Sequence, residues 1–177
     1  GFLPDIRRIL GALPKKRQNL LFSATMPREI QALADGILHD PLRVSVARVA
    51  TPAETVDHSV WMCQKQGKGA LLRELLQREA RGRTLVFART KRGADKLAIA
   101  LSRDGLSVTA IHGNKSQAQR TKALEGFRSG RVRVLVASDV AARGLDVDNI
   151  EHVINYELPQ DPETYVHRIG RTGRAGV

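Results

Sequence analysis

Residues 84–113 read TLVFARTKRGADKLAIALSRDGLSVTAIHG, and this stretch decides the fold class. An apolar run at 84–88 is followed by apolar residues at helical spacing over 94–101, by Gly105, and by a second apolar run at 107–111. Strand, helix and strand in this order predict a βαβ crossover, which joins two parallel strands. The sequence therefore predicts an α/β fold with a parallel sheet.

The same alternation continues on both sides of this stretch. We expect further helices at the leucine-rich run 71–76 closed by Gly82, after a capping box of Ser116 and Gln119, and after the Asp161-Pro162 cap, with strands at 132–137 and 150–155. Helices should cover both faces of such a sheet, and ligands bind beyond the carboxyl ends of its strands. The loops of interest are therefore 88–91, 112–116, 138–148 and the segment after the last helix.

The first 46 residues follow a different pattern. An apolar run at 19–22 predicts a strand, and helical spacing over 30–37 predicts a helix that ends before Pro41. Val44 and Val46 alternate as in a strand. Residues 47–57, with few large apolar side chains, are typical of a linker. We therefore expect one domain that ends at residue 46 and a second over residues 58–177.

Charge and composition favour a polyanionic partner. The chain has 29 Lys and Arg against 18 Asp and Glu, a formal net charge of +11. Such a surplus favours nucleic acid, although a well-solvated basic surface is the alternative interpretation. Aromatic residues make up 4% of the chain, so if RNA binds, its contacts should be mainly to phosphates rather than by base stacking.

Other features narrow the class of protein. A single cysteine, Cys63, excludes an internal disulfide and a thiolate zinc cluster, and we expect no metal site and a reducing, cytoplasmic setting. No apolar run approaches the about 20 residues of a membrane span, so no membrane partner is expected. The chain begins Gly1-Phe2 with neither an initiator Met nor a signal peptide, which reads as a cut through a longer protein.

Residues 167–176, HRIGRTGRAG, form the most informative run. Arg168, Arg171 and Arg174 recur every three residues, close to one helical turn, and Gly170 and Gly173 let the backbone approach a partner closely. Guanidinium groups stay charged and bind phosphate oxygens bidentately, so this cluster could grip a phosphate. Cations that complement a helix C-terminus are the alternative.

A second run, ASDVAARGLD at residues 137–146, directly follows a predicted buried strand. Ser138 supplies a hydroxyl and Asp139 and Asp146 supply carboxylates, and Arg143 and Gly144 lie in the same strand-to-loop segment. Such a set suits a contact to a ribose or a phosphate. A plain loop whose Asp side chains satisfy turn amides would explain Asp148 and Asn149, but it explains Arg143-Gly144 poorly.

Together the two runs resemble motifs V and VI of DEAD-box RNA helicases. Residues 23–25, Ser-Ala-Thr, match motif III of that family, residues 85–90 resemble motif IV, and Gln117 with Arg120 matches motif IVa. The resemblance covers essentially all 177 residues and is closest to bacterial RhlE-like members. It implies a RecA-like helicase C-terminal domain over 58–177, truncated at its C-terminus, preceded by the end of a first RecA-like domain over 1–46.

The resemblance implies nucleotide roles for five residues. Arg171 and Arg174 would be arginine fingers at the γ-phosphate of ATP, Asp146 would contact the ribose, and Gly144 would lie at the same nucleotide. His167 would join the catalytic set by pairing with the DEAD carboxylates across the cleft. In this family Mg²⁺ accompanies the ATP.

It also implies residues that bind RNA and that couple binding to hydrolysis. Gly113, Arg120 and Ser138 would hold the RNA sugar-phosphate backbone, and the coupling set would be Ser23, Thr25, Arg143 and Asp139. The sequence departs from the family pattern at Ser138, where threonine is usual, and at Leu145, where isoleucine is usual. The first change keeps the hydroxyl, and the second is nearly isosteric.

The 177 residues contain neither a Gly-x-x-x-x-Gly-Lys-Ser/Thr phosphate loop nor an Asp-Glu-Ala-Asp run. ATP with Mg²⁺ would therefore be held mainly by an N-terminal RecA-like domain. The expected partners are RNA, ATP and that domain. We expect part of an ATP-dependent RNA helicase, inactive alone. A stand-alone RNA-binding module without ATPase activity is the alternative, and a DNA-translocating helicase fits the motif wording less well.

Overall fold

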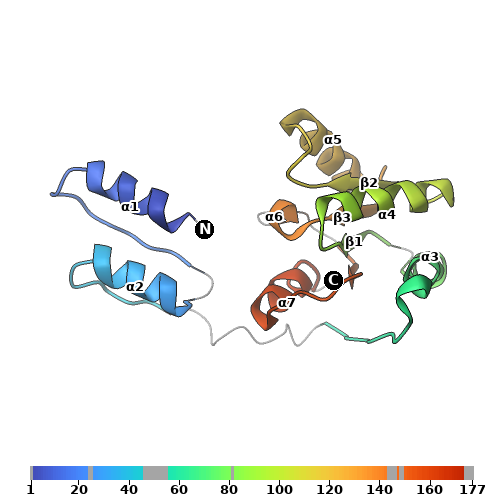
Figure 1. Cartoon of the computed structure of the whole chain (residues 1–177), viewed down its shortest axis with the longest axis horizontal. Coiled ribbons are helices and arrows are strands. Elements are labelled where there is room, and N and C mark those ends of the chain that lie inside the picture. Colours follow the sequence, from blue (N-terminus) through green and yellow to red (C-terminus); the bar gives the residue numbers. More distant parts are fainter. Residues whose placement is uncertain are drawn as a thin grey trace. The chain divides into compact units, whose positions relative to one another are not determined.

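The computed structural model describes residues 2–23, 26–45, 56–80, 82–142, 147 and 150–173. The chain divides into two compact units, residues 1–49 and 50–177 (Figure 1). This division falls within the predicted linker at 47–57, of which residues 47–55 lie outside the described residues. The domain boundaries therefore stay a prediction, and each unit is described by itself.

The first unit contains two helices, α1 (Leu3–Ala12) and α2 (Arg28–Ile37). The helix predicted at 30–37 is confirmed, whereas α1 was not predicted. The strands predicted at 19–22 and at Val44 are wrong, and Val46 lies outside the described residues. A strand forms only where a neighbouring backbone completes its ladder. Within the described part of this unit the Asn19 amide instead donates to the carbonyl oxygen of Ile37 at 2.7 Å.

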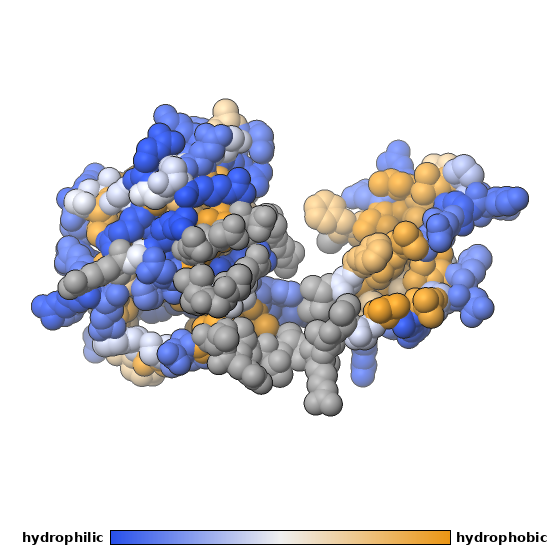
Figure 2. Space-filling model, turned by 180° about the vertical axis from the view of Figure 1, so that it is seen from behind, coloured by the Kyte–Doolittle hydropathy of each residue, from blue (hydrophilic) through white to orange (hydrophobic). Residues whose placement is uncertain are grey.

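Apolar side chains of the first unit remain at its surface. Among its described residues only Ala34 is buried. The exposed large apolar residues are Phe2, Ile6, Ile9, Leu13, Leu20, Phe22, Met26, Leu42 and Val44. Figure 2 shows a broad hydrophobic surface on one face of this unit. These helices therefore bury no core of their own.

The second unit is an α/β layer structure, as predicted. Its elements in chain order are η1 (Lys65–Gly67), α3 (Lys68–Arg78), β1 (Thr84–Phe87), α4 (Lys91–Arg103), β2 (Val108–Ile111), α5 (Gln117–Arg128), β3 (Val134–Ala137), α6 (Asp139–Ala142), β4 (His152–Asn155) and α7 (Pro162–Ile169). The described strands form one sheet in the order β2-β3-β1-β4, and all neighbours are parallel. The parallel sheet of the predicted fold class is confirmed.

Local signals start and stop the helices. The predicted capping box is present: Ser116 accepts from the Gln119 N–H, and the Gln119 side chain accepts from the Ser116 N–H. Asp161 caps α7 by accepting from Thr164 N–H at 2.7 Å. Gly105 follows α4 with φ +81°, a backbone conformation that side chains with a Cβ rarely adopt. The one-turn helix α6 was not predicted, because residues 138–148 read as a loop.

Two hydrophobic cores lie on opposite faces of the sheet. Strand side chains alternate between faces, so Val86 joins a core with α3 and α4, whereas Leu85 and Phe87 join one with α5 and α6. Figure 1 shows α4 lying along β2 and β3. Because a core lies on each face, the sheet is covered on both sides, which explains its nearly continuous apolar strands.

None of the helices in the described ranges is long and apolar enough to cross a membrane.

The core under α5 should depend strongly on Phe127, whose side chain is fully buried. Phe127→Ala should lower the free energy of unfolding by about 3 to 5 kcal/mol, because it removes apolar contacts and leaves a cavity. Urea unfolding followed by circular dichroism measures the change. Ile99→Ala on the outer face of α4 is the matched control and should have little effect, because Ile99 is 53% exposed. Similar losses for both variants would contradict this core.

Candidate functional site

Four strand ends meet at one edge of the second unit. Because β1 to β4 are parallel, the residues that follow them, Ala88, His112, Ser138 and Tyr156, all lie at the carboxyl edge of the sheet. Helix α6 begins directly after Ser138, and hydrogen bonds from α7 reach the same edge. This is the edge where ligands of parallel α/β sheets bind.

The Arg168 guanidinium is the best-satisfied group at this edge. Its Nε and Nη2 donate to the two carboxylate oxygens of Asp139 at 2.6 and 2.8 Å. Nη1 donates to the Asn155 side-chain oxygen at 2.7 Å and to the Glu157 carbonyl oxygen at 2.8 Å. The guanidinium carbon lies 4.8 Å from the centre of the Phe87 ring. Because Arg168 is only 3% exposed, this ion pair is structural and ties α7 to α6.

Sequence reasoning missed this role by grouping Arg168 with Arg171 and Arg174. Helix α7 ends at Ile169, so Arg171 lies in the turn beyond it, and Arg174 lies outside the described residues. Arg168 faces the interior and is not available to a phosphate. Helical spacing could have revealed this, because Tyr165, Arg168 and Ile169 share one face of α7.

The turn after α7 is fixed at its base. Gly173 has φ +67°, and the Thr172 hydroxyl contacts the carbonyl oxygens of Ile150 and Glu151. Arg171 sits in this turn and is partly exposed. His167 is on α7, 42% exposed, with Nε2 3.6 Å from Glu163 Oε1. Both predicted residues can thus be reached by a ligand.

A second cluster surrounds the loop after β2. His112 is 2% exposed; its Nδ1 accepts from the Asn114 N–H at 3.3 Å, and its Nε2 lies 2.9 Å from Asp95 Oδ2. The distance is that of a hydrogen bond, although its angles depart from ideal geometry. Lys115 Nζ lies 2.9 Å from the other oxygen of Asp95. The cluster pins the loop that carries Gly113.

The electrostatics of Asp95 follow from these neighbours. Its pKa is lowered from the usual 3.8, first by the contact with His112 and also by Lys115, while burial acts in the opposite direction. The carboxylate therefore favours the folded state in its charged form.

The predicted RNA-contacting residues lie close to this cluster and to α6. A Cβ added at exposed Gly113 would meet Lys91 Cε at 3.4 Å, and Lys91 Nζ donates to Asn114 at 2.9 Å. Ser138 is 7% exposed, and its N–H donates to the Ile111 carbonyl oxygen at 3.3 Å. Arg120 donates from Nη1 to Gln117 at a long 3.3 Å, and its buried Nε has no acceptor in the described structure.

Five predicted site residues lie outside the described residues: Thr25, Arg143, Gly144, Asp146 and Arg174. Ser23 is exposed in the first unit, and Asp139 is the partner of Arg168. Within the described ranges no three His, Cys, Asp or Glu side chains gather in a way that could hold a metal ion.

Comparisons with known proteins give consistent results. The family described as "Helicase conserved C-terminal domain" matches residues 67–176. A DEAD box protein from the hyperthermophile Methanococcus jannaschii is 42% identical over 100% of this chain and 47% of its own, with a TM-score of 0.66. S. cerevisiae Dbp5, bound to RNA and ADP BeF3, is 34% identical over 99% of this chain and 47% of its own, with a TM-score of 0.83.

The E. coli DEAD-box protein SrmB, bound to regulator of ribonuclease activity A, is also similar. It is 42% identical over 63% of this chain and 66% of its own, with a TM-score of 0.60. The present chain thus spans about half the length of the first two relatives, 47% in each case, and 66% of the SrmB chain.

Breaking the ion pair between Arg168 and Asp139 should destabilise the second unit. Arg168→Lys should lower the free energy of unfolding by about 2 to 4 kcal/mol, because an ammonium cannot replace the planar fork; Asp139 is 34% exposed, which keeps the loss below that of wholly enclosed pairs. Thermal melts measure the loss. His167→Ala is the control and should cost little. Equal stability of Arg168→Lys and the unchanged chain would show that the pair is not structural.

The Asp95 contacts predict a pH-dependent stability. A depressed folded-state pKa stabilises the protein above the unfolded value of 3.8, and this contribution is lost as the pH falls through the folded-state pKa. Asp95→Asn should therefore lower the melting temperature at pH 7, and the difference from the unchanged chain should shrink below about pH 4. Glu74→Gln, which alters an exposed surface pair, is the control. A difference that is constant with pH would refute this account.

Proposed function

The chain belongs to the helicase family defined by the conserved C-terminal domain, and from its DEAD-box relatives we propose that it is part of an ATP-dependent RNA helicase. The intact protein would couple ATP hydrolysis to RNA binding and local separation of a duplex. These residues would supply the arginine fingers and half of the RNA-backbone site. The RhlE-like subgroup stays a prediction.

One observation carries the proposal: the Asp139–Arg168 pair holds together the two motif-bearing segments at the carboxyl edge of the sheet. Asp139 starts α6, just after Ser138, and Arg168 precedes the turn with Arg171. A ligand at this edge would therefore meet residues from both segments at once. A stand-alone RNA-binding module would give Arg171 no comparable purpose.

Residues for the nucleotide come from the turn after α7 and from the segment after α6. Arg171 fits a phosphate, because a guanidinium is always charged and donates bidentately. Asp146 and Gly144 would contact the nucleotide at its ribose. Arg174 would be the second arginine finger at the γ-phosphate. When bound, ATP with Mg²⁺ supplies the phosphoryl group whose transfer to water drives the cycle. Because this sequence lacks a phosphate loop, we propose that another RecA-like domain holds most of that group.

Arg171 would act on charge that develops in the transition state. As a phosphoryl group leaves, negative charge spreads over its oxygens, and a planar guanidinium stabilises it more than an ammonium does. His167, partly exposed on α7, would pair with carboxylates of the other domain. Its contact with Glu163 at 3.6 Å is weak enough to be exchanged for such a partner.

RNA would bind through its backbone at Gly113, Arg120 and Ser138. At Gly113 the absence of a side chain and the nearby Lys91 ammonium suit the close approach of a phosphate. Within the described residues the Arg120 guanidinium makes one long hydrogen bond, to Gln117, so an anionic acceptor can replace that partner at small cost. Such contacts bind RNA without reading its base sequence.

We also propose that residues 1–46 are the end of a preceding RecA-like domain. The apolar surface of the first unit supports this proposal. Among the described residues of that unit, Ala34 alone is buried. An apolar surface of this kind normally lies against further structure. Closure of two such domains on ATP and RNA would bend one RNA strand, with the γ-phosphate biasing the closed state.

The test is phosphate release by the chain alone and by a version completed with the N-terminal domain of a DEAD-box relative. The chain alone should release none, and the completed protein should show RNA-stimulated turnover. Arg171→Ala should then lower kcat about a hundredfold or more with a smaller effect on ATP binding. Arg171→Lys should restore little, because the planar fork is lost.

Arg103→Ala, at the exposed last turn of α4, removes the same charge and should leave turnover unchanged. Circular dichroism confirms that each variant is folded. RNA-stimulated turnover by the chain alone, or near-normal turnover of Arg171→Lys, would refute the assigned role.

A further inference from the structure

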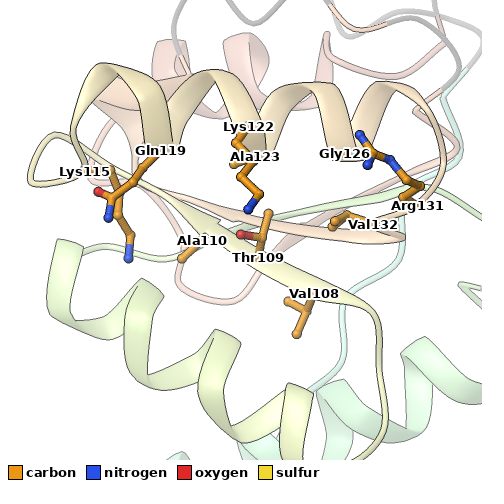
Figure 3. A pocket seen from close by; sticks show the side chains of 10 residues that line it. All are labelled: Val108, Thr109, Ala110, Lys115, Gln119, Lys122, Ala123, Gly126, Arg131 and Val132. Atoms are coloured by element: carbon orange, nitrogen blue, oxygen red, sulfur yellow. The ribbon is translucent and has the colours of Figure 1, made fainter.

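A groove runs between the edge strand β2 and helix α5, on a different side of α5 from Arg120. It has a volume of about 390 Å³ (Figure 3). Its lining consists of Val108, Thr109, Ala110, Lys115, Gln119, Lys122, Ala123, Gly126, Arg131 and Val132. On α5 the lining residues Gln119, Lys122, Ala123 and Gly126 recur at helical spacing, so they share one face. Arg120 is about 100° around the helix from Gln119.

The floor of this groove is an open sheet edge. Among the described strands, β2 is the last in the sheet order and pairs with β3 alone. The carbonyl oxygen of Ser107 accepts from the N–H of Val134, and that of Ile111 accepts from Ser138. Because successive residues of a strand point in alternate directions, the N–H and C=O groups of Val108 and Ala110 face away from β3. Neither residue has a backbone partner on that side in the described structure.

The groove is positively charged along its length. Three cations line it, Lys115, Lys122 and Arg131, and none of its ten lining residues is acidic. Figure 3 shows Lys122 reaching from α5 toward Thr109 in the middle, with Lys115 and Arg131 at the two ends. Lys115 is paired with Asp95, and Arg131 uses Nε for Ser129 at 3.1 Å. Lys122 and the remaining Arg131 nitrogens can therefore meet an incoming anion.

We propose that this groove binds an extended acidic segment of a partner protein, which adds as a strand beside β2. Main-chain groups of the segment would pair with Val108 and Ala110, and its carboxylates would meet Lys122 and Arg131. Addition of a strand to an open edge is a common mode of peptide recognition. The positive charge of the groove favours an acidic segment. This inference does not rest on the proposed helicase function.

A peptide fits the groove better than a nucleic-acid strand does. The edge presents both donors and acceptors, alternating at the spacing of a β-strand, and a peptide backbone offers the matching acceptors and donors. Phosphate groups offer acceptors alone, and the 2′-hydroxyl donors of RNA do not recur at the spacing of the Val108 and Ala110 carbonyl oxygens.

The test uses the 177-residue chain and a fluorescent ten-residue peptide in which Glu and Val alternate. The peptide should bind in an anisotropy titration and should slow hydrogen exchange at the Val108 and Ala110 amides. Lys122→Glu should weaken binding about tenfold or more, because it places like charges together. Lys96→Glu, the same charge change at an exposed site on α4 outside the groove, is the matched control and should change affinity less than about twofold.

A second variant tests the backbone contact. Val108→Pro removes one outward N–H, which an edge strand tolerates, and should abolish the slowed exchange at Ala110 together with binding. If that variant does not fold, Lys122→Glu and the hydrogen-exchange data on the unchanged chain still test whether the peptide binds beside β2. Binding that Lys122→Glu does not weaken, or binding without protection of both amides, would overturn the proposal. Equal protection by an oligouridine RNA would assign the groove to nucleic acid instead.

Discussion

The enclosure of Arg168 is the constraint on which the carboxyl edge of the second unit depends. A guanidinium that is 3% exposed has lost its hydration, and such a charge must find partners in the protein. Asp139, Asn155, the Glu157 carbonyl and the Phe87 ring provide them. These groups come from α6, from β4 and the turn after it, and from β1. One side chain of α7 therefore contacts three other elements of the second unit.

This arrangement separates three arginines that look equivalent along the chain. Arg168 is buried and paired with other groups of the fold, whereas Arg171 follows the end of the helix and is partly exposed. The buried member positions the turn, and the Thr172 hydroxyl fixes the same turn against the start of β4. The arginine that we propose as a phosphate ligand thus lies three residues beyond one that holds the backbone. Precise positioning of this kind is what phosphate chemistry requires of a guanidinium.

The parallel sheet accounts for the location of both candidate sites. Its carboxyl edge collects the loops after all four strands, and helices close both faces, which leaves those loops as the natural place for ligands. The described strands form an open sheet, which has lateral edges. At β2 one such edge lies beside α5 and a row of cations. Ligand chemistry and partner binding can therefore occupy different sides of one unit.

Much of the fold could be predicted because its signals are local. The cap at Asp161 and the Ser116–Gln119 box depend on residues three or four positions apart, and strand-helix alternation shows in the apolar spacing. The strand expected at 19–22 failed because a strand depends on what pairs beside it. Helix α1 was missed although its signals are local: Pro4 lies in its first turn, and Leu3, Ile6 and Leu10 recur at helical spacing. The bond between Arg168 and Asp139 and the placement of β2 at a sheet edge were decided by the tertiary structure alone. They require contacts between residues far apart in the chain, and no local pattern encodes those contacts.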